Sequence, residues 1–154
     1  MSLESLTITS NVLRLAPDQP LSESVAAMIA AGVECAPVCD GDKVVAVLSL
    51  GDILGDIVPV SARIEHGLTD LTFAGDSPHL LNKHLKERLA LDTGVAASPA
   101  GPLTVIKANC PLLEAVFLLA RRSPLPVVTE DGHLKGMVCR ADLITHLIQN
   151  QKKS

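Results

Sequence analysis

Hydrophobic and polar positions follow one pattern twice along the chain. In the first copy, an extended segment from Val12 to Leu15 precedes apolar residues that recur at helical spacing between Leu21 and Ile29. Two short apolar runs, Ala36 to Cys39 and Val44 to Leu48, are separated by turn-forming residues and predict two strands. A helix through Ile57 ends the copy, so the predicted order is β-α-β-β-α.

The second copy has the same order of elements. Its extended segment runs from Leu103 to Lys107, and its first helix carries the apolar residues between Leu112 and Ala120. The predicted strands are Leu125 to Val128 and Leu134 to Cys139, and the closing helix carries Asp142 to Ile148. A repeated unit that cannot bury its own apolar face packs against its copy, so we expect a mixed α/β (α+β) fold of two packed units.

A spacer that departs from the repeat separates the two copies. The chain therefore divides into a first repeat (1–58), a connecting insert (59–100) and a second repeat (101–154). Within the insert, Ser77 and Pro78 predict the start of a helix. We expect this helix to cover the core or a dimer surface, because one of its faces is apolar and carries Leu80, Leu81, Leu85 and Leu89.

The composition limits the classes of function. Of the 154 residues, 47% are hydrophobic and only 1% are aromatic, so aliphatic side chains must build the core. The absence of Trp and Tyr removes base-stacking platforms, and the formal net charge of −4 argues against binding to nucleic-acid phosphates. The sequence shows no signal peptide and no segment long enough to span a membrane, so we expect a soluble cytoplasmic protein without a membrane or nucleic-acid partner.

The cysteines and histidines form no metal or redox motif. His79 and His84 are five residues apart, which does not place them on one helical face. No nucleophile beside a base and no carboxylate pair can be identified, so we predict neither a metal site nor an enzyme. Without C-x-x-C spacing, we expect reduced and mostly buried thiols at Cys35, Cys39, Cys110 and Cys139.

The best candidates for chemistry lie where the second strand of each copy meets its closing helix. This junction is Ser49-Leu50-Gly51-Asp52 in the first copy and, 90 residues later, Cys139-Arg140-Ala141-Asp142 in the second. Free backbone amides and the helix dipole can hold a phosphate at such a junction, with the Ser49 hydroxyl as a further donor. Asp52 can accept both hydroxyls of a ribose, although Ser-x-x-Asp is also a helix-capping pattern. The recurrence of the aspartate favours the binding interpretation.

These residues resemble the cystathionine β-synthase (CBS) domain, whose tandem pairs are often called Bateman modules. The resemblance covers both repeats and leaves the insert unmatched. It rests on three motifs in a fixed order: Pro20-Leu21 and Pro111-Leu112, then Ala36-Pro37-Val38-Cys39 and Leu125-Pro126-Val127-Val128, then Ala46-x-x-Ser49-x-x-Asp52 and Gly136-x-x-Cys139-x-x-Asp142.

The resemblance implies two β-α-β-β-α units packed with pseudo-twofold symmetry, commonly assembled as a disc-shaped homodimer. Such modules bind AMP, ADP, ATP or S-adenosylmethionine as regulatory ligands, not as catalytic cofactors, for example in energy sensing. The resemblance assigns ribose binding to Asp52 and Asp142. It assigns the phosphate contacts to Ser49, Cys139 and Arg140. The adenine pocket that it implies consists of Leu13, Arg14, Ala36, Pro37, Val38, Thr104, Val105, Leu125, Pro126 and Val127.

Two positions depart from the family motif. Ala46 replaces the glycine of the first copy, and Cys139 replaces the Ser or Thr of the second, which removes a good hydrogen-bond donor. We therefore expect unequal sites, with the site around Asp52 the better formed. Two functions remain open: a regulatory module that binds an adenosyl ligand and acts on an unidentified protein target, or a ligand-free module for dimerisation and protein interaction.

Overall fold

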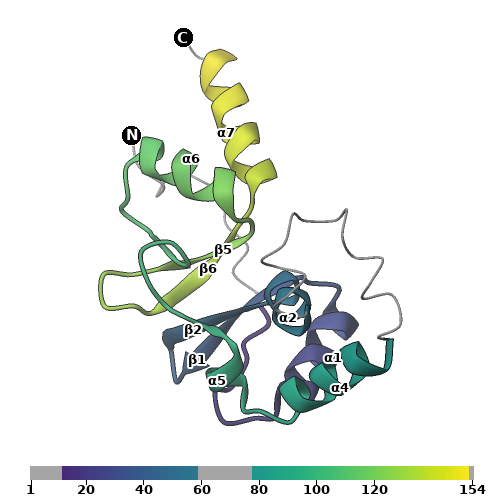
Figure 1. Ribbon diagram of the computed structural model, residues 1–154. Coiled ribbons are helices and arrows are strands. Elements are labelled where there is room, and N and C mark those ends of the chain that lie inside the picture. Colours follow the sequence, from purple (N-terminus) through teal and green to yellow (C-terminus); the bar gives the residue numbers. More distant parts are fainter. Residues whose placement is uncertain (1–11, 59–77, 153–154) are drawn as a thin grey trace.

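Two small sheets, each accompanied by helices, form the two halves of the protein (Figure 1). The computed structural model describes residues 12–58 and 78–152. The first half contains α1 (Leu21–Ala31), β1 (Cys35–Asp40), β2 (Lys43–Ser49), α2 (Leu50–Ile57), α4 (Pro78–Leu89), α5 (Thr93–Ala96) and β3 (Ser98–Pro99). The second half contains β4 (Ile106–Lys107), α6 (Leu112–Arg121), β5 (Leu125–Val128), β6 (Leu134–Val138) and α7 (Arg140–Lys152).

The repeat predicted from the sequence is confirmed. The second half has the order β-α-β-β-α, and its sheet has the strand order β4-β5-β6. The first half has the same order, except that its first strand is reduced to one bridge, in which Leu15 pairs in parallel with Val38. β4 is shorter than the predicted segment because residues 102–104 form a turn. The mixed α/β fold class is therefore confirmed.

A glycine fixes the end of α1. Gly32 has a left-handed backbone with a φ of 70°, a conformation that glycine adopts without steric cost. Its N–H donates to the Ile29 carbonyl at 3.1 Å, and the Val33 N–H donates to the Met28 carbonyl at 3.0 Å. These bonds satisfy the last carbonyls of the helix and turn the chain directly into β1.

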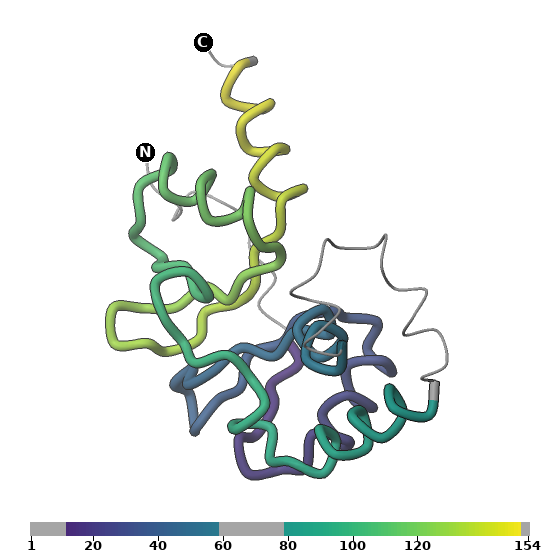
Figure 2. Tube along the Cα trace, viewed as in Figure 1, coloured from purple at the N-terminus to yellow at the C-terminus, as the bar shows by residue number. Residues whose placement is uncertain are grey.

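The described part of the insert packs on the first half. α4 contacts α1 and α2, and Leu85 and Leu89 reach the core, whereas Leu80 and Leu81 are exposed. β3 pairs antiparallel with β2, and the chain then crosses to the second half (Figure 2). α4 thus covers the core of the first half, one of the two roles expected for it. The remainder of the expected insert, 59–77, lies outside the described residues.

Each half has its own apolar core, and a third buried cluster joins the two sheets. α6 buries Ala115, Leu118 and Leu119 in the core of the second half. The cluster between the sheets consists of Cys35, Cys39, Val44, Val47, Val128 and Met137. In the described part of the chain, no helix has both the length and the apolar character needed to cross a membrane.

Two turns extend this junction with backbone hydrogen bonds. The Val44 N–H donates to the Gly132 carbonyl, and the Leu134 N–H donates to the Asp42 carbonyl, both at 2.9 Å. These bonds connect the β1–β2 turn to the β5–β6 turn. The relative position of the two halves is therefore set by directional bonds as well as by apolar burial.

Replacing Leu119 with Ala should lower the free energy of unfolding by about 2–5 kcal/mol, because truncating a buried leucine leaves a cavity. Leu119 is 1% exposed, whereas Leu103 is 55% exposed and serves as the matched control. Leu103→Ala should change the same quantity by less than about 0.5 kcal/mol. Denaturant titration followed by far-UV circular dichroism measures both variants, and equal losses would contradict this placement of Leu119.

Candidate ligand-binding site

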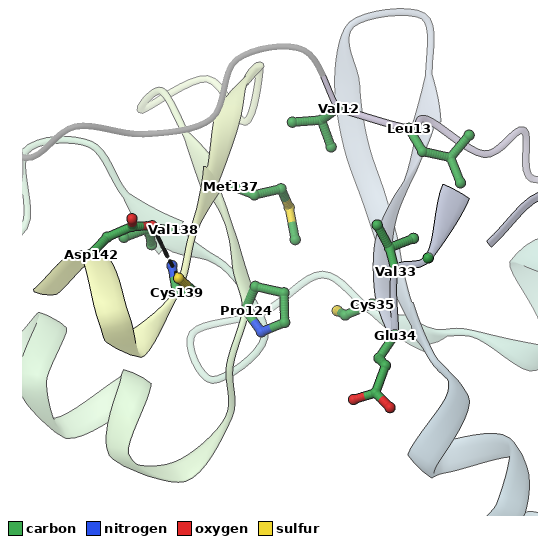
Figure 3. A pocket seen from close by; sticks show the side chains of 11 residues that line it. Val12, Leu13, Val33, Glu34, Cys35, Pro124, Met137, Val138, Cys139 and Asp142 are labelled. Carbon is green, nitrogen blue, oxygen red and sulfur yellow. Dashed lines mark hydrogen bonds between the residues drawn. The ribbon is translucent and has the colours of Figure 1, made fainter. Parts of the chain in front are cut away.

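A cavity of about 370 Å³ lies between the two halves (Figure 3). The first half contributes the turn from α1 into β1, and the second contributes the end of β6 and the start of α7. The lining is mostly apolar and consists of Val12, Leu13, Gly32, Val33, Glu34, Cys35, Pro124, Met137, Val138, Cys139 and Asp142. A molecule in this cavity would contact both repeats at once.

Asp142 lies at the edge of this cavity, in the first turn of α7. Its Oδ2 accepts hydrogen bonds from the Cys139 N–H at 3.0 Å and from the Cys139 Sγ at 3.2 Å. This is helix-capping geometry, in which a first-turn side chain reaches back to the residue before the helix. Oδ1 makes no hydrogen bond within the described residues. One carboxylate oxygen therefore caps α7, and the other is free to accept hydroxyl groups.

The guanidinium of Arg140 is bound outside the cavity. Its Nε donates to the Leu119 carbonyl at 2.6 Å and its Nη2 to the Ala120 carbonyl at 3.2 Å. A cation is favourable there because it meets the negative end of the α6 dipole. The cavity lining includes two carboxylates, Glu34 and Asp142, and no Lys or Arg among the described residues. The site thus carries net negative charge.

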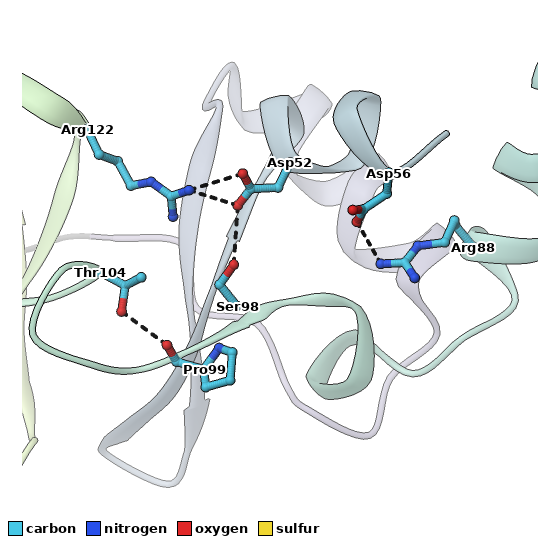
Figure 4. A network of polar contacts seen from close by, with 7 residues as sticks. All are labelled: Asp52, Asp56, Arg88, Ser98, Pro99, Thr104 and Arg122. Carbon is cyan, nitrogen blue, oxygen red and sulfur yellow. Dashed lines mark hydrogen bonds and ion pairs between the residues drawn. The ribbon is translucent and has the colours of Figure 1, made fainter. Parts of the chain in front are cut away.

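Asp52, the counterpart of Asp142, has a different environment (Figure 4). The Arg122 Nη2 donates to Asp52 Oδ1 at 3.0 Å and to Oδ2 at 3.1 Å. The Ser98 hydroxyl donates to Oδ2 at 3.4 Å. Ser49 precedes α2 but makes no side-chain capping bond. Both oxygens of Asp52 are therefore already engaged by protein groups.

The geometry differs from the expectation that the Asp52 side would be the better formed. Asp52 borders a more open depression along α2, where a second ion pair joins Asp56 to Arg88 at 2.7 Å. The less open and mostly apolar cavity lies at Asp142 instead. On the Asp52 side, the side chain of Arg122, which follows α6, reaches across to the first half.

The cavity brings together three of the residues expected at the site: Leu13, Cys139 and Asp142. Arg14 is exposed and pairs with Asp42, and the Thr104 hydroxyl donates to the Pro99 carbonyl within its own loop. The expected adenine residues on the strands are buried: Ala36, Pro37, Val38, Leu125, Pro126 and Val127. Val105 is half-buried and packs with the cluster between the sheets.

The sequence interpretation missed the residues that directly precede each apolar-Pro-Val motif. Val33, Glu34 and Cys35 precede Ala36, and Pro124 precedes Leu125. Their only signal in the sequence is this position next to the motif. Val33, Glu34 and Pro124 precede their strands and are at least partly exposed, whereas the motif itself is buried in the sheet.

The comparison with protein families agrees with this architecture. A model of the CBS domain matches residues 3–59 and 97–149. The chain belongs to the CBS domain family. The two matched segments correspond to the two repeats, so the chain carries a tandem CBS pair.

Solved structures of CBS-pair proteins share this fold at low sequence identity. CBSX2 from Arabidopsis thaliana is 22% identical, with a TM-score of 0.69 over 99% of this chain and 98% of that one. CBSX2 in complex with AMP is 21% identical, with a TM-score of 0.66 over 97% of this chain and 98% of that one. CbpB of Listeria monocytogenes in complex with c-di-AMP is 21% identical, with a TM-score of 0.65 over 98% and 97% of the two chains. No curated protein matches the sequence.

The cysteines around the site should differ in reactivity. Cys139 is half-buried, whereas Cys35, Cys39 and Cys110 are buried. Burial raises the pKa of the Cys35 thiol to about 11 and also raises the pKa values of Cys39 and Cys110. Because the thiolate is the reactive form, iodoacetamide at mildly alkaline pH should modify Cys139 first.

Intact-protein mass spectrometry after short exposures should therefore show one fast adduct, with all four cysteines modified in urea. Cys139→Ser should remove the fast adduct and leave the slow ones. Several fast adducts on the folded wild-type protein would show that the other thiols are not buried.

Proposed function

We propose that this CBS pair is a regulatory module that binds an adenosyl ligand in the cavity at Asp142. The observation that carries the proposal is a mostly apolar cavity of about 370 Å³ formed by both repeats, with Asp142 at its edge. Small-molecule sites commonly have volumes of about 300–1,000 Å³, apolar walls and a few polar groups that fix orientation. The complexes of CBSX2 with AMP and of CbpB with c-di-AMP support an adenine-containing ligand.

The lining suggests how the ligand is held. The adenine packs between the apolar side chains of the first half, such as Val33, and those of the second half, such as Met137. The ribose hydroxyls donate to Asp142 Oδ1, while Oδ2 keeps its bonds to Cys139. An ionised acceptor makes such bonds stronger than neutral pairs.

The charge of the lining favours particular members of the ligand class. Glu34 and Asp142 contribute two carboxylates, and the guanidinium of Arg140 is bound to α6. A polyphosphate would bring further negative charge close to the half-buried Asp142 and the exposed Glu34, and this repulsion costs Coulomb energy, most of it at Asp142. Among AMP, ADP, ATP and S-adenosylmethionine, we therefore expect the cationic S-adenosylmethionine to bind best and ATP to bind worst.

Binding can act as a signal because the ligand contacts both repeats. A ligand shifts the balance between two arrangements only by its difference in affinity for them. Since the lining comes from both halves, a change in the distance between the halves would change the contacts of the ligand directly. The readout would be a change in a dimer or in the contact with an unidentified protein target; we propose no catalytic role.

The exposed face of α6 and α7 supports assembly into a homodimer. Leu113 is 81% exposed and Phe117 52%, and the neighbouring α7 exposes Ile144 at 55% and Ile148 at 48%. In the first half α4 covers part of the corresponding helix pair, α1 and α2, although Ile29 and Leu54 of that pair are also exposed, at 66% and 64%. If no adenosyl compound binds, dimerisation and protein interaction through such a face would be the function of the chain.

Asp142→Ala should abolish stabilisation of the protein by an adenosyl ligand. A ligand at 100 times its Kd adds about 2.7 kcal/mol to the free energy of unfolding, which a thermal-shift screen of adenosine, AMP, ADP, ATP and S-adenosylmethionine detects. The same substitution also removes the cap on Cys139, which should cost the ligand-free protein about 0.5–2 kcal/mol.

Asp142→Asn is the matched control for the cap. Its amide oxygen can still accept from the Cys139 N–H, so the ligand-free stability should stay near that of the wild type. Ligand-induced stabilisation should still fall, because the negative charge is lost. Wild-type shifts in Asp142→Ala would show that the aspartate does not bind the ligand.

Phe117→Ser should convert the proposed dimer to a monomer. Sedimentation velocity should give about twice the 16.2 kDa chain mass for the wild type and a single chain mass for the variant. Val95→Ser, at a residue that is 69% exposed on α5, should leave the dimer intact. A monomeric wild type, or a Phe117→Ser variant that remains dimeric, would exclude this face as the interface.

A further inference from the structure

The Asp52 side of the pair differs from the Asp142 side because its aspartate is held in an ion pair. One nitrogen of Arg122, Nη2, donates to both carboxylate oxygens of Asp52 at 3.0 and 3.1 Å. Ser98 donates a further bond to Oδ2 at 3.4 Å. The two charged side chains are 31% and 36% exposed, so the pair is partly buried. The carboxylate that would accept ribose hydroxyls is thus occupied by a group of the protein itself.

The repeat explains why the two sides differ. Ala36 and Leu125 occupy the same position in the two apolar-Pro-Val motifs, and three residues before them lie Val33 and Arg122. Val33 lines the cavity at Asp142. Arg122 has an extended backbone at the end of α6, with a φ of −146°, and extends toward Asp52. At one repeat position, a short apolar side chain therefore lines the cavity at Asp142, whereas a long cation binds Asp52.

A ligand at Asp52 would have to replace the guanidinium. The bonds that it would break are charge-assisted on both sides, whereas ribose hydroxyls are neutral donors to the same carboxylate. The Nη1 of Arg122 is buried and has no hydrogen-bond partner within the described residues. One end of the guanidinium is therefore buried although the side chain as a whole is 31% exposed, and a ligand would have to break both bonds of Nη2 to reach Asp52.

From these observations we infer that Arg122 closes the Asp52 side, so that the chain binds one adenosyl ligand, at Asp142, and not two. The inference rests on the proposed function, because it assumes that the free aspartate holds the ligand. Arg122 competes with ribose hydroxyls for the carboxylate of Asp52. Both repeats have the aspartate, but only that of the second repeat, Asp142, has an oxygen that is free to bind a ligand.

Isothermal titration calorimetry with adenosine and with AMP tests this stoichiometry. The wild type should bind one equivalent, and Arg122→Ala should bind two, because the Asp52 carboxylate is released. Arg122→Met keeps an aliphatic side chain of similar length without the charge, and it should also bind two equivalents. This variant replaces Arg122→Ala in the test if far-UV circular dichroism shows that Arg122→Ala is unfolded. The double variant Asp142→Ala/Arg122→Ala should bind one equivalent, now at Asp52.

Arg88→Ala provides the matched control. Arg88 pairs with Asp56, also on α2, at 2.7 Å, with side chains that are 32% and 38% exposed. Its removal disrupts an equivalent ion pair without freeing Asp52, so this variant should still bind one equivalent. A second equivalent in Arg88→Ala would mean that general loosening of α2, and not release of Asp52, opens the site.

The two proposals fail in different ways. Two equivalents in the wild type, with either probe, would overturn the closure of Asp52 and leave the proposed ligand class standing. One equivalent in both Arg122→Ala and Arg122→Met would also overturn it. No binding of adenosine or AMP to the wild type, together with no stabilisation by S-adenosylmethionine, would overturn the proposed function and the inference that rests on it.

Discussion

The contact between the two sheets is the constraint on which the rest of the structure depends. Val47 and Val128 are buried between the sheets at 0% and 2% exposure, and two backbone bonds at 2.9 Å tie the neighbouring turns together. Apolar burial alone is non-directional, whereas the paired turns fix how the halves face each other. The cavity at Asp142 exists because the start of α7 is held opposite the turn that follows α1. A change in this junction would therefore alter the site without touching any residue of its lining.

The two repeats form similar frameworks, but single positions give them different properties. Both repeats keep an aspartate in the first turn of their closing helix. One carboxylate oxygen of Asp142 caps α7, whereas both carboxylate oxygens of Asp52 accept hydrogen bonds from Arg122. The contrast shows that the same aspartate in the same motif can be a binding group or one half of an internal ion pair. The neighbouring repeat decides between the two roles.

The sequence predicted most of the fold but only part of the candidate site. Hydrophobic periodicity and the recurring Pro-Val runs gave the element order, because these signals act over a few residues. These local signals did not predict the length of the first strand of each repeat. Leu15 forms only a single bridge, because a strand at this position depends on pairing with Val38, which is distant in the sequence. Arg122 was missed because it acts on a residue 70 positions earlier in the chain. Long-range contacts of one long side chain leave no periodic pattern, so motifs alone could not show which of the two aspartates is held in an ion pair.

A crystal structure of the wild-type protein grown with saturating adenosine would test the account most directly. The account predicts one adenosine per chain between the two repeats, with its ribose on Asp142 Oδ1 and the Arg122–Asp52 ion pair intact. Electron density for adenosine on Asp52, with Arg122 displaced, would contradict the assignment of the site. The absence of electron density for adenosine at both aspartates would contradict adenosyl binding itself, provided that the adenosine concentration is one that saturates CBS pairs with known ligands.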